Sequence, residues 1–361
     1  MYEKLTPPVQ QIPAVNIPRA YATGHSLIRQ RGILENTRNG PALVLPGPTI
    51  TSITQPWERV LFDEMRDANP FFHLMEAMWM LAGRRDVETI AEFNKRMVEY
   101  SDDGEIYHAA YGQRWREWFG MDQLSKIIHG LRTNPEDRRL VLTMWSPLGD
   151  LAHDGKDVPC NTQAMFRTRR ETVRKESIVH PGMMIDEEQI YLDMTVCNRS
   201  NDFFWGLMGA NAVHMSIMHE YVAALSGMHQ GHMYTLSNNL HAYTSVFNDK
   251  PRVDLIQAMS YNHMKIAPHP LFRIMGQSTP SYASLMSDQF KVQLNEWWCG
   301  ERDITSIGEF TDEGALTVGL MRASYRAWKR GDRDLALDTA IQVPAVDWSR
   351  AAVEWIERRT R

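Results

Sequence analysis

Two long apolar segments constrain the fold more than any other feature of the sequence. Residues 69–83, NPFFHLMEAMWMLAG, begin with Asn-Pro and end at a glycine, which are the usual boundaries of a helix. Residues 209–227, GANAVHMSIMHEYVAALSG, are apolar around nearly the whole helical circumference. Because a helix without a polar face is normally buried, we expect the chain to fold around long central helices.

Shorter apolar segments predict strands that pack against these helices. They either follow polar turns or alternate apolar and polar side chains. The predicted strands are residues 42–45, 50–53, 140–145 and 190–197. Strands mixed with long helices along one chain indicate an α+β fold.

The net charge and the number of cysteines argue against several classes of protein. The chain has 361 residues and a formal net charge of -5, which argues against general binding of nucleic acid or of a membrane surface. Its three cysteines are too few for a disulfide framework and favour a reducing cytoplasm. No apolar run reaches the roughly 18 residues of a membrane span, and no metal-binding or phosphate-loop motif occurs.

Cys160 stands out because it lies in a polar segment, DGKDVPCNTQAMF. A lone cysteine is most often a small, inert, buried side chain. A nucleophilic thiol instead needs positive charge nearby in order to ionise. Four arginines at turns or strand ends could supply that charge and bind a phosphate: Arg38, Arg138, Arg139 and Arg199.

Three other side chains have both a structural and a functional interpretation. Glu76 lies within the apolar helix of residues 69–83. Either it occupies the one wet face of that helix, or it is a partly buried carboxyl group suited to proton transfer. His241 and Tyr243 are two residues apart and so share one face of a strand. They form an ordinary strand pair or bind a sugar hydroxyl.

Seven segments, taken in order, resemble the thymidylate synthase family, which includes phage-type pyrimidine nucleotide hydroxymethylases. They are NTRNG, HLMEAMWMLAG, AAYGQRWREW, NPEDRRLVLTMWSP, VPCNTQAMF, NRSNDFFWGLMGAN and SNNLHAY, and they span about residues 36–243. The resemblance implies a large mixed β-sheet with long central helices and an obligate homodimer formed through the sheet. It also implies a cytoplasmic enzyme, in the host cytoplasm if the chain is phage-encoded.

The resemblance further implies covalent catalysis on a pyrimidine nucleoside monophosphate, with 5,10-methylenetetrahydrofolate as cosubstrate and no metal. Cys160 would add to C6 of the pyrimidine ring, while Glu76 and Tyr111 would organise water and move protons. The implied binding residues are Arg38 and Arg199 for the 5′-phosphate, Arg138 and Arg139 from the partner subunit, Ser200 for phosphate or base, Asn211 for the base, His241 and Tyr243 for the 3′-hydroxyl, and Asp202, Trp115 and Gly206 for the folate.

Asn211 favours uracil, because one side-chain amide matches the N3–H donor and the O4 acceptor of that base. An aspartate would instead suit cytosine. Counting without a gap from Arg199 reaches Ala210, so the choice of Asn211 assumes an adjustment of one residue at the turn.

Three departures from the synthase pattern bear on the product. Met97 and Tyr100 stand where synthases carry shielding tryptophans, Asn161 stands where they usually have histidine, and the chain ends in EWIERRTR instead of an apolar tail. A wetter pocket favours attack by water over hydride transfer. We therefore prefer hydroxymethylation of dUMP. The alternatives are dCMP or CMP hydroxymethylation, thymidylate synthase, and a nucleotide binder without chemistry, for which Asn161 is the best argument.

Two domains are predicted. Residues 1–250 would form the catalytic domain, starting with an extended proline-rich arm over residues 1–20 and carrying a charged insert at about 167–188 that is a solvated loop or hairpin extension. Residues 251–361 would form a mostly helical extension of unassigned role packed on that domain.

Overall fold

The structure is a computed structural model that describes residues 9–62, 66–177, 180, 182–247, 261, 266–276 and 278–359. Its helices and strands are, in chain order, β1 (Gln10–Ala14), α1 (Ile17–Arg31), β2 (Ile33–Thr37), β3 (Gly40–Val44), β4 (Thr49–Ile53), α2 (Pro70–Leu81), α3 (Val87–Ala91), η1 (Lys95–Tyr100), α4 (Tyr111–Arg116), α5 (Gln123–Thr133), β5 (Val141–Thr143), α6 (Pro147–Asp150), β6 (Asn161–Glu176), β7 (Met184–Asn198), β8 (Asn201–Asp202), η2 (Phe203–Ala210), α7 (Asn211–Leu225), β9 (His229–Ser237), β10 (Leu240–Tyr243), α10 (Pro280–Cys299), η3 (Ile304–Ser306), α11 (Asp312–Lys329), α12 (Arg333–Ile341) and α13 (Val346–Arg358).

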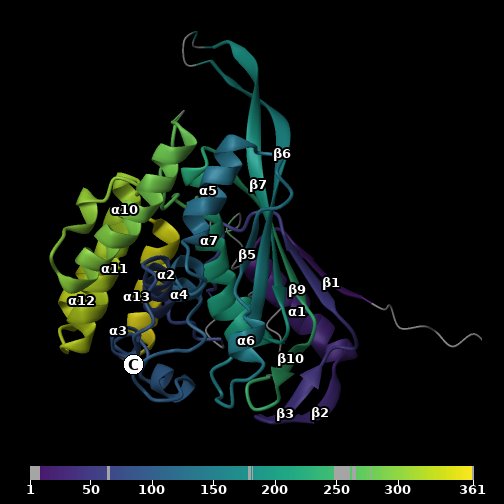
Figure 1. Ribbon diagram of the computed structural model, residues 1–361. Coiled ribbons are helices and arrows are strands. Elements are labelled where there is room, and N and C mark those ends of the chain that lie inside the picture. Colours follow the sequence, from purple (N-terminus) through teal and green to yellow (C-terminus); the bar gives the residue numbers. More distant parts are fainter. Residues whose placement is uncertain are drawn as a thin grey trace, which may run out of the picture.

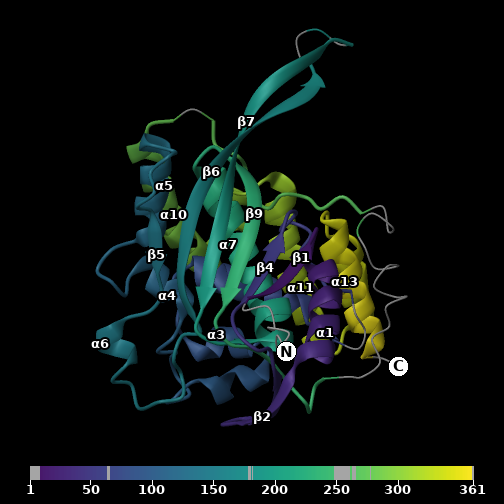
Figure 2. The ribbon, with the colours of Figure 1, turned by 90° about the vertical axis from the view of Figure 1, so that its right-hand side faces the viewer.

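A six-stranded sheet in the order β1-β4-β9-β7-β6-β5 forms the centre of the molecule (Figure 1). The pairs β1–β4 and β7–β9 are parallel and the other neighbours are antiparallel, so the sheet is mixed. A smaller sheet in the order β2-β3-β10-β8 lies at one end. Figure 2 shows α7 behind the large sheet, between the sheet and the C-terminal helices. The predicted α+β fold, with a mixed sheet and long central helices, is confirmed.

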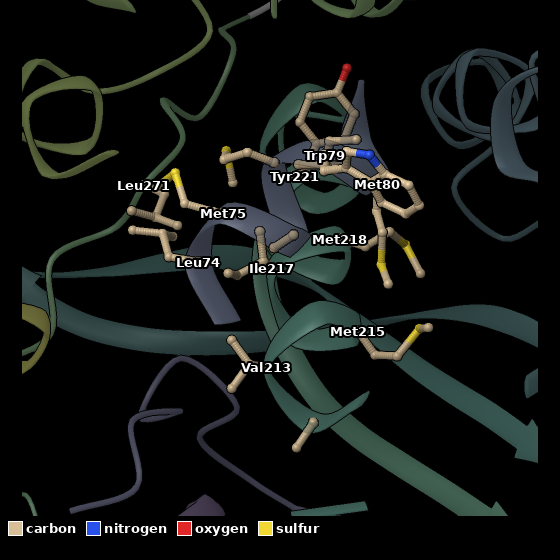
Figure 3. Close-up of a cluster of buried hydrophobic side chains, with 14 of the residues drawn as sticks. Leu74, Met75, Trp79, Met80, Val213, Met215, Ile217, Met218, Tyr221 and Leu271 are labelled. Atoms are coloured by element: carbon tan, nitrogen blue, oxygen red, sulfur yellow. The ribbon is translucent and has the colours of Figure 1, made fainter. Parts of the chain in front are cut away.

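The two apolar segments form α2 and α7, which pack against each other at the centre of the core (Figure 3). Every residue of α2 is buried, and so is every residue of α7 after the first. Asn69 caps α2 by accepting a hydrogen bond from the Phe72 N–H at 3.1 Å, and Pro70 occupies the first turn. Proline fits there because the first helical N–H groups have no intrahelical acceptor.

The described helices after residue 279 continue the same hydrophobic core. Helix α10 packs on α5, while α11 and α13 pack on α2. The fully buried Arg116 of α4 donates a hydrogen bond at 2.9 Å to Ser287 Oγ on α10. The predicted domain boundary at residue 250 falls outside the described residues, so the division into two domains stays a prediction.

Two predictions about exposed segments have different outcomes. The prediction of an extended arm is wrong for residues 17–20, which begin α1, because Asn16 caps that helix and Pro18 occupies its first turn. The charged insert is confirmed as a hairpin extension. Strands β6 and β7 continue together beyond the body of the molecule (Figure 1).

Candidate active site

A cavity of about 480 Å³ opens between α2, the start of α4, the start of β6 and the segment from β8 to α7. Half of the predicted site residues meet there. The predicted residues that line the cavity are Glu76, Tyr111, Cys160, Ser200, Asp202, Gly206 and Asn211.

Three hydrogen bonds to two residues, Tyr111 and Arg199, hold the backbone around Cys160. The Tyr111 hydroxyl oxygen accepts from the N–H groups of Cys160 and Asn161, each at 3.0 Å. The Arg199 N–H donates to the Cys160 carbonyl at 2.9 Å. Because Cys160 immediately precedes β6, these bonds fix the thiol at the edge of the sheet and at the wall of the cavity.

The charge environment of the thiol has two opposing parts. Burial raises the pKa of Cys160, while the positive charges of Arg199 and Arg38 lower it, and burial outweighs them in this single chain. The Arg199 guanidinium also donates to the carbonyl oxygens of Pro159 at 2.8 Å and Val158 at 3.0 Å. Arg199 therefore ties the loop before Cys160 in place and brings positive charge to the thiol.

Glu76 does not occupy a wet face of its helix, because it is 6% exposed and its buried carboxyl group meets the cavity. Burial raises the pKa of Glu76 to about 8 and lowers the pKa of His214 to about 3. Their side chains lie 3.2 Å apart, but both are neutral near pH 7, so this contact is not an ion pair. A protonated carboxyl group in this position can deliver a proton into the cavity.

His73 is a cavity residue that the sequence analysis missed. It lies one turn before Glu76 on α2, and its ring meets that of His214 edge-on at 6.3 Å. Burial lowers the pKa of His73 well below its usual value, so its imidazole is neutral. The signal available in the sequence was the i, i+3 spacing of His73 and Glu76 on one helix face.

Asn211 is the first residue of α7 and follows the π-helix η2. A π-helical turn accommodates one more residue than an α-helical turn. Gly209 adopts φ -116° and ψ -118°, and a Cβ there would lie 2.5 Å from the Phe204 carbonyl oxygen. This irregular turn lies directly before Asn211, and the choice of Asn211 as the residue that reads the base stays a prediction.

The small sheet holds the two residues predicted for the sugar. His241 and Tyr243 share a face of β10 with ring centroids 5.2 Å apart, and His241 pairs in register with Asp202 of β8. His241 Nδ1 lies 3.0 Å from Asn239 Oδ1. The two side chains therefore adjoin the cavity through Asp202 but do not line it.

Besides Arg199, His241 and Tyr243, four predicted residues do not line the cavity within one chain. Trp115 is completely buried in the core, and Arg38 is exposed on the turn between β2 and β3. Arg138 and Arg139 are exposed before β5, where Arg139 Nη2 lies 2.8 Å from Asp137 Oδ2. That a partner subunit receives these two arginines stays a prediction.

The rest of the cavity lining includes two residues that were placed there by counting and several that were not predicted. Met97 and Tyr100, placed there by counting, do line the cavity. Besides His73, the lining residues that were not predicted are Arg66, Asp67, Asn69, Phe72, Asn94, Asn201, Trp205, Ala210 and Arg359. Asp67 and Arg359 are 292 positions apart in the chain, so no local pattern could have paired them.

The described residues contain no group of three or more histidine, cysteine, aspartate or glutamate side chains placed to hold a metal ion. Among the same residues, no helix combines the length and the hydropathy needed to cross a membrane.

Comparison with known proteins gives a consistent set of relatives. Residues 66–293 match the family described as thymidylate synthase. The deoxyuridylate hydroxymethyltransferase of Pseudomonas phage M6 is 41% identical over 360 residues, covering 95% of this chain and 93% of that protein. The protein of the same name from Bacillus phage SP01 is 26% identical over 340 residues, covering 86% and 84%. The crystal structure of thymidylate synthase from T4 phage has a TM-score of 0.51 at 18% identity, covering 76% of this chain and 91% of that one, which supports the fold.

Proposed function

Because the chain belongs to the thymidylate synthase family, we propose that it hydroxymethylates dUMP at C5. The observation that carries the proposal is the meeting of Cys160, Glu76 and Asn211 at one cavity. A nucleophile, a protonated carboxyl group and an amide are the three groups that the reaction needs around a uracil ring. The relatives named deoxyuridylate hydroxymethyltransferase, similar over nearly the whole chain, support the same reaction.

The chemistry begins at the thiol. Cys160 Sγ forms a bond to C6 of the pyrimidine, which makes C5 nucleophilic and divides one difficult step into two easier ones. The one-carbon unit comes from 5,10-methylenetetrahydrofolate at the oxidation level of formaldehyde, so the product requires no reductant. C5 attacks the methylene carbon of the folate as one of the two C–N bonds of that carbon breaks. C5 then loses its proton as the second C–N bond breaks, which releases tetrahydrofolate and leaves an exocyclic methylene on C5. Water adds to this methylene carbon as the C6–Sγ bond breaks, leaving 5-hydroxymethyl-dUMP and free Cys160.

Side chains around the cavity have defined parts in this scheme. Glu76, protonated near neutral pH, moves protons at the pyrimidine, and Tyr111 holds the backbone of the nucleophile. Asn211 pairs with the edge of uracil. Asp202, Gly206 and the half-exposed Trp205 line the cavity, and we assign them to the folate. A flat pteridine fits against such an aromatic surface.

The phosphate and sugar are assigned to residues at the edges of the site. Arg38 and Arg199 bind the 5′-phosphate with Ser200, and His241 and Tyr243 bind the 3′-hydroxyl. Arg138 and Arg139 reach the phosphate of the partner's site in a homodimer. We place the enzyme in the cytoplasm.

Water is the preferred final nucleophile because the mouth of the cavity is charged. Arg66, Asp67 and Arg359 line it where an apolar closure would be needed to exclude water. Reductive methylation to dTMP is the alternative within the same scheme.

The test is mass spectrometry of the product formed from dUMP, dCMP or CMP with 5,10-methylenetetrahydrofolate. We expect the mass gain of a hydroxymethyl group on dUMP, and a methyl gain would instead establish a synthase.

Cys160→Ser should abolish turnover while nucleotide binding persists. Cys197→Ser is the matched control, because Cys197 lies half-buried on β7 and does not line the cavity. Near-normal turnover by Cys160→Ser, or no product from any of the three nucleotides, would overturn the proposal.

A further inference from the structure

A row of side-chain amides runs beneath the cavity, across the ends of the strands. Asn161 begins β6 and is paired with Asn198 at the end of β7, which is paired in turn with Ser237 at the end of β9. Asn201 lies in β8, and Asn211 begins α7. The row therefore joins the main sheet, the small sheet and the central helix at one point.

The hydrogen bonds of the row all run in one direction. Asn198 Nδ2 donates to Asn161 Oδ1. Asn161 Nδ2 donates to Asn211 Oδ1 at 3.3 Å, and Asn211 Nδ2 donates to Asn201 Oδ1 at 3.4 Å. Asn201 Nδ2 then donates to the Ser237 hydroxyl at 3.1 Å. Each amide thus receives from one neighbour and donates to the next.

Only part of the row can touch a ligand. Asn201 and Asn211 line the cavity, whereas Asn161 is 0% exposed and does not line it. Asn211 uses one lone pair of Oδ1 and one N–H of Nδ2 within the row. One lone pair and one N–H remain for a ligand, because an amide has two of each.

We propose that Asn161 is a positioning residue that sets the direction of the Asn211 amide and thereby excludes cytosine. The inference rests on the proposed function, in which Asn211 reads the base. With Oδ1 directed toward Asn161, the free acceptor faces N3–H of uracil and the free donor faces O4. Cytosine would present an acceptor and a donor in the opposite arrangement.

An isolated asparagine would not discriminate in this way. A half-turn about its last torsion exchanges oxygen and nitrogen, and the reversed amide matches cytosine. In the row, reversal of Asn211 requires Asn161, Asn198 and Asn201 to turn as well. In the observed direction Asn198 Oδ1 is the one amide atom of the row without a partner. Reversal would put unpaired N–H groups there instead, and buried N–H groups are tolerated less well than an under-satisfied oxygen.

The test is the ratio of the dissociation constants for dUMP and dCMP, measured by calorimetry for three substitutions of Asn161. Asn161→Leu removes the donor and should reduce the preference for dUMP about tenfold. Asn161→Asp, when ionised, only accepts hydrogen bonds, so it should reverse the Asn211 amide and favour dCMP. Asn161→His can donate through an imidazole N–H and should keep the preference for dUMP.

A substitution of Gly206 tests the same row of amides through Asn201 and Asn211 instead of through Asn161. A Cβ at Gly206 would lie 2.5 Å from Asn201 Oδ1 and 3.2 Å from Asn211 Nδ2. Gly206→Ala should therefore lower the same ratio without any change at Asn161.

The ratio is measured by binding and the reaction by product mass, so the inference and the proposed function can fail separately. A ratio that stays within about twofold of the wild-type value in Asn161→Leu, Asn161→Asp and Gly206→Ala, all folded by circular dichroism, would overturn the inference. Loss of the preference for dUMP in Asn161→His would also overturn the inference, because an N–H donor at position 161 would then not be enough to direct the Asn211 amide.

Discussion

At the scale of single residues, the site depends on groups that burial keeps neutral. Glu76 would be ionised at neutral pH in water, but with its pKa raised to about 8 it keeps its proton. His214 would be close to half-protonated near pH 6.5, but with its pKa lowered to about 3 it has none. Each group avoids the cost of a buried charge. The result is a protonated carboxyl group at the cavity, beside an unprotonated imidazole that does not line it.

The raised pKa of Glu76 predicts a pH-dependent stability. Between the unfolded value of 4.5 and the folded value of about 8, the native state binds more protons than the unfolded state. The contribution of Glu76 is therefore complete below the unfolded pKa and is lost as pH rises toward the folded pKa. A displacement of one pKa unit corresponds to about 1.4 kcal/mol, so we expect the contribution of Glu76 to the free energy of unfolding to fall by about 2–4 kcal/mol from about pH 5 to about pH 8, a slope opposite in sign to that of the buried, neutral His214.

Glu76→Gln should remove this slope, because glutamine has no titrating proton. Urea unfolding across the pH range measures it, with the exposed Glu99→Gln as a matched control that keeps the wild-type slope. The same Glu76 variant should lose about 10²–10⁴-fold in kcat if the carboxyl group transfers protons. A wild-type slope in Glu76→Gln would show that Glu76 is ionised in the folded protein.

At the scale of elements, the C-terminal helix closes one side of the cavity mouth. Asp67 Oδ1 accepts from Arg358 Nε at 3.1 Å, and both carboxylate oxygens accept from Arg359 at 3.0 and 2.6 Å. The Arg359 guanidinium also lies over the Trp355 ring at 3.8 Å. Asp67 is held at φ 45°, the left-handed region that asparagine also tolerates. The end of α13 is therefore fastened to the segment that precedes α2.

Asp67→Asn keeps the backbone conformation and removes the charge, so it should loosen the end of α13. We expect a loss of about 1 kcal/mol or less in unfolding free energy and a rise of about two- to fivefold in the KM for the folate. Hydrogen exchange of the last turn of α13 should accelerate, while dUMP affinity stays unchanged. Glu354→Gln is the matched control, because Glu354 pairs with Arg350 within the same helix at 2.7 Å. If hydrogen exchange in the last turn of α13 is equally fast in Asp67→Asn and Glu354→Gln, Asp67 does not hold the end of this helix in place.

The elements show what the sequence can and cannot predict. Helices α2 and α7 were predictable because a long apolar run has no other stable place than the core. Helix α1 was missed because its start, Asn16 with Pro18, resembles an extended proline-rich segment. The π-helix before Asn211 was not predictable, because no local sequence pattern distinguishes it from an ordinary helix start and its geometry depends on packing. The Asp67–Arg359 contact arises purely from tertiary folding.

At the scale of the whole molecule, one face of the central sheet has no described helix packed across its central strands. Helix α7 lies behind the sheet in Figure 2, and no other described helix crosses the central strands β6, β7 and β9 on the side facing the viewer. Along β9 the residues alternate between buried and half-buried, so Tyr234 and Leu236 point to this open face. Ile50 of β4 is 37% exposed on the same face. Apolar side chains exposed together on one face indicate an interaction surface, and the proposed second copy of the chain would cover it.

A dimer with shared sites makes a prediction that a monomer cannot meet. In a mixture of Cys160→Ala and Arg139→Ala chains, each mixed dimer has one site with both defects and one site with neither. Random assortment makes half of the dimers mixed, so about a quarter of the wild-type activity should return, although each variant alone is nearly inactive. Arg139 itself is exposed, and among the residues that the structure describes its guanidinium bonds to Asp137, which leaves the guanidinium accessible to a partner. The control is a mixture of Cys160→Ala with Cys160→Ser, which cannot restore any site. If the first mixture is no more active than the control, each active site is built from a single chain.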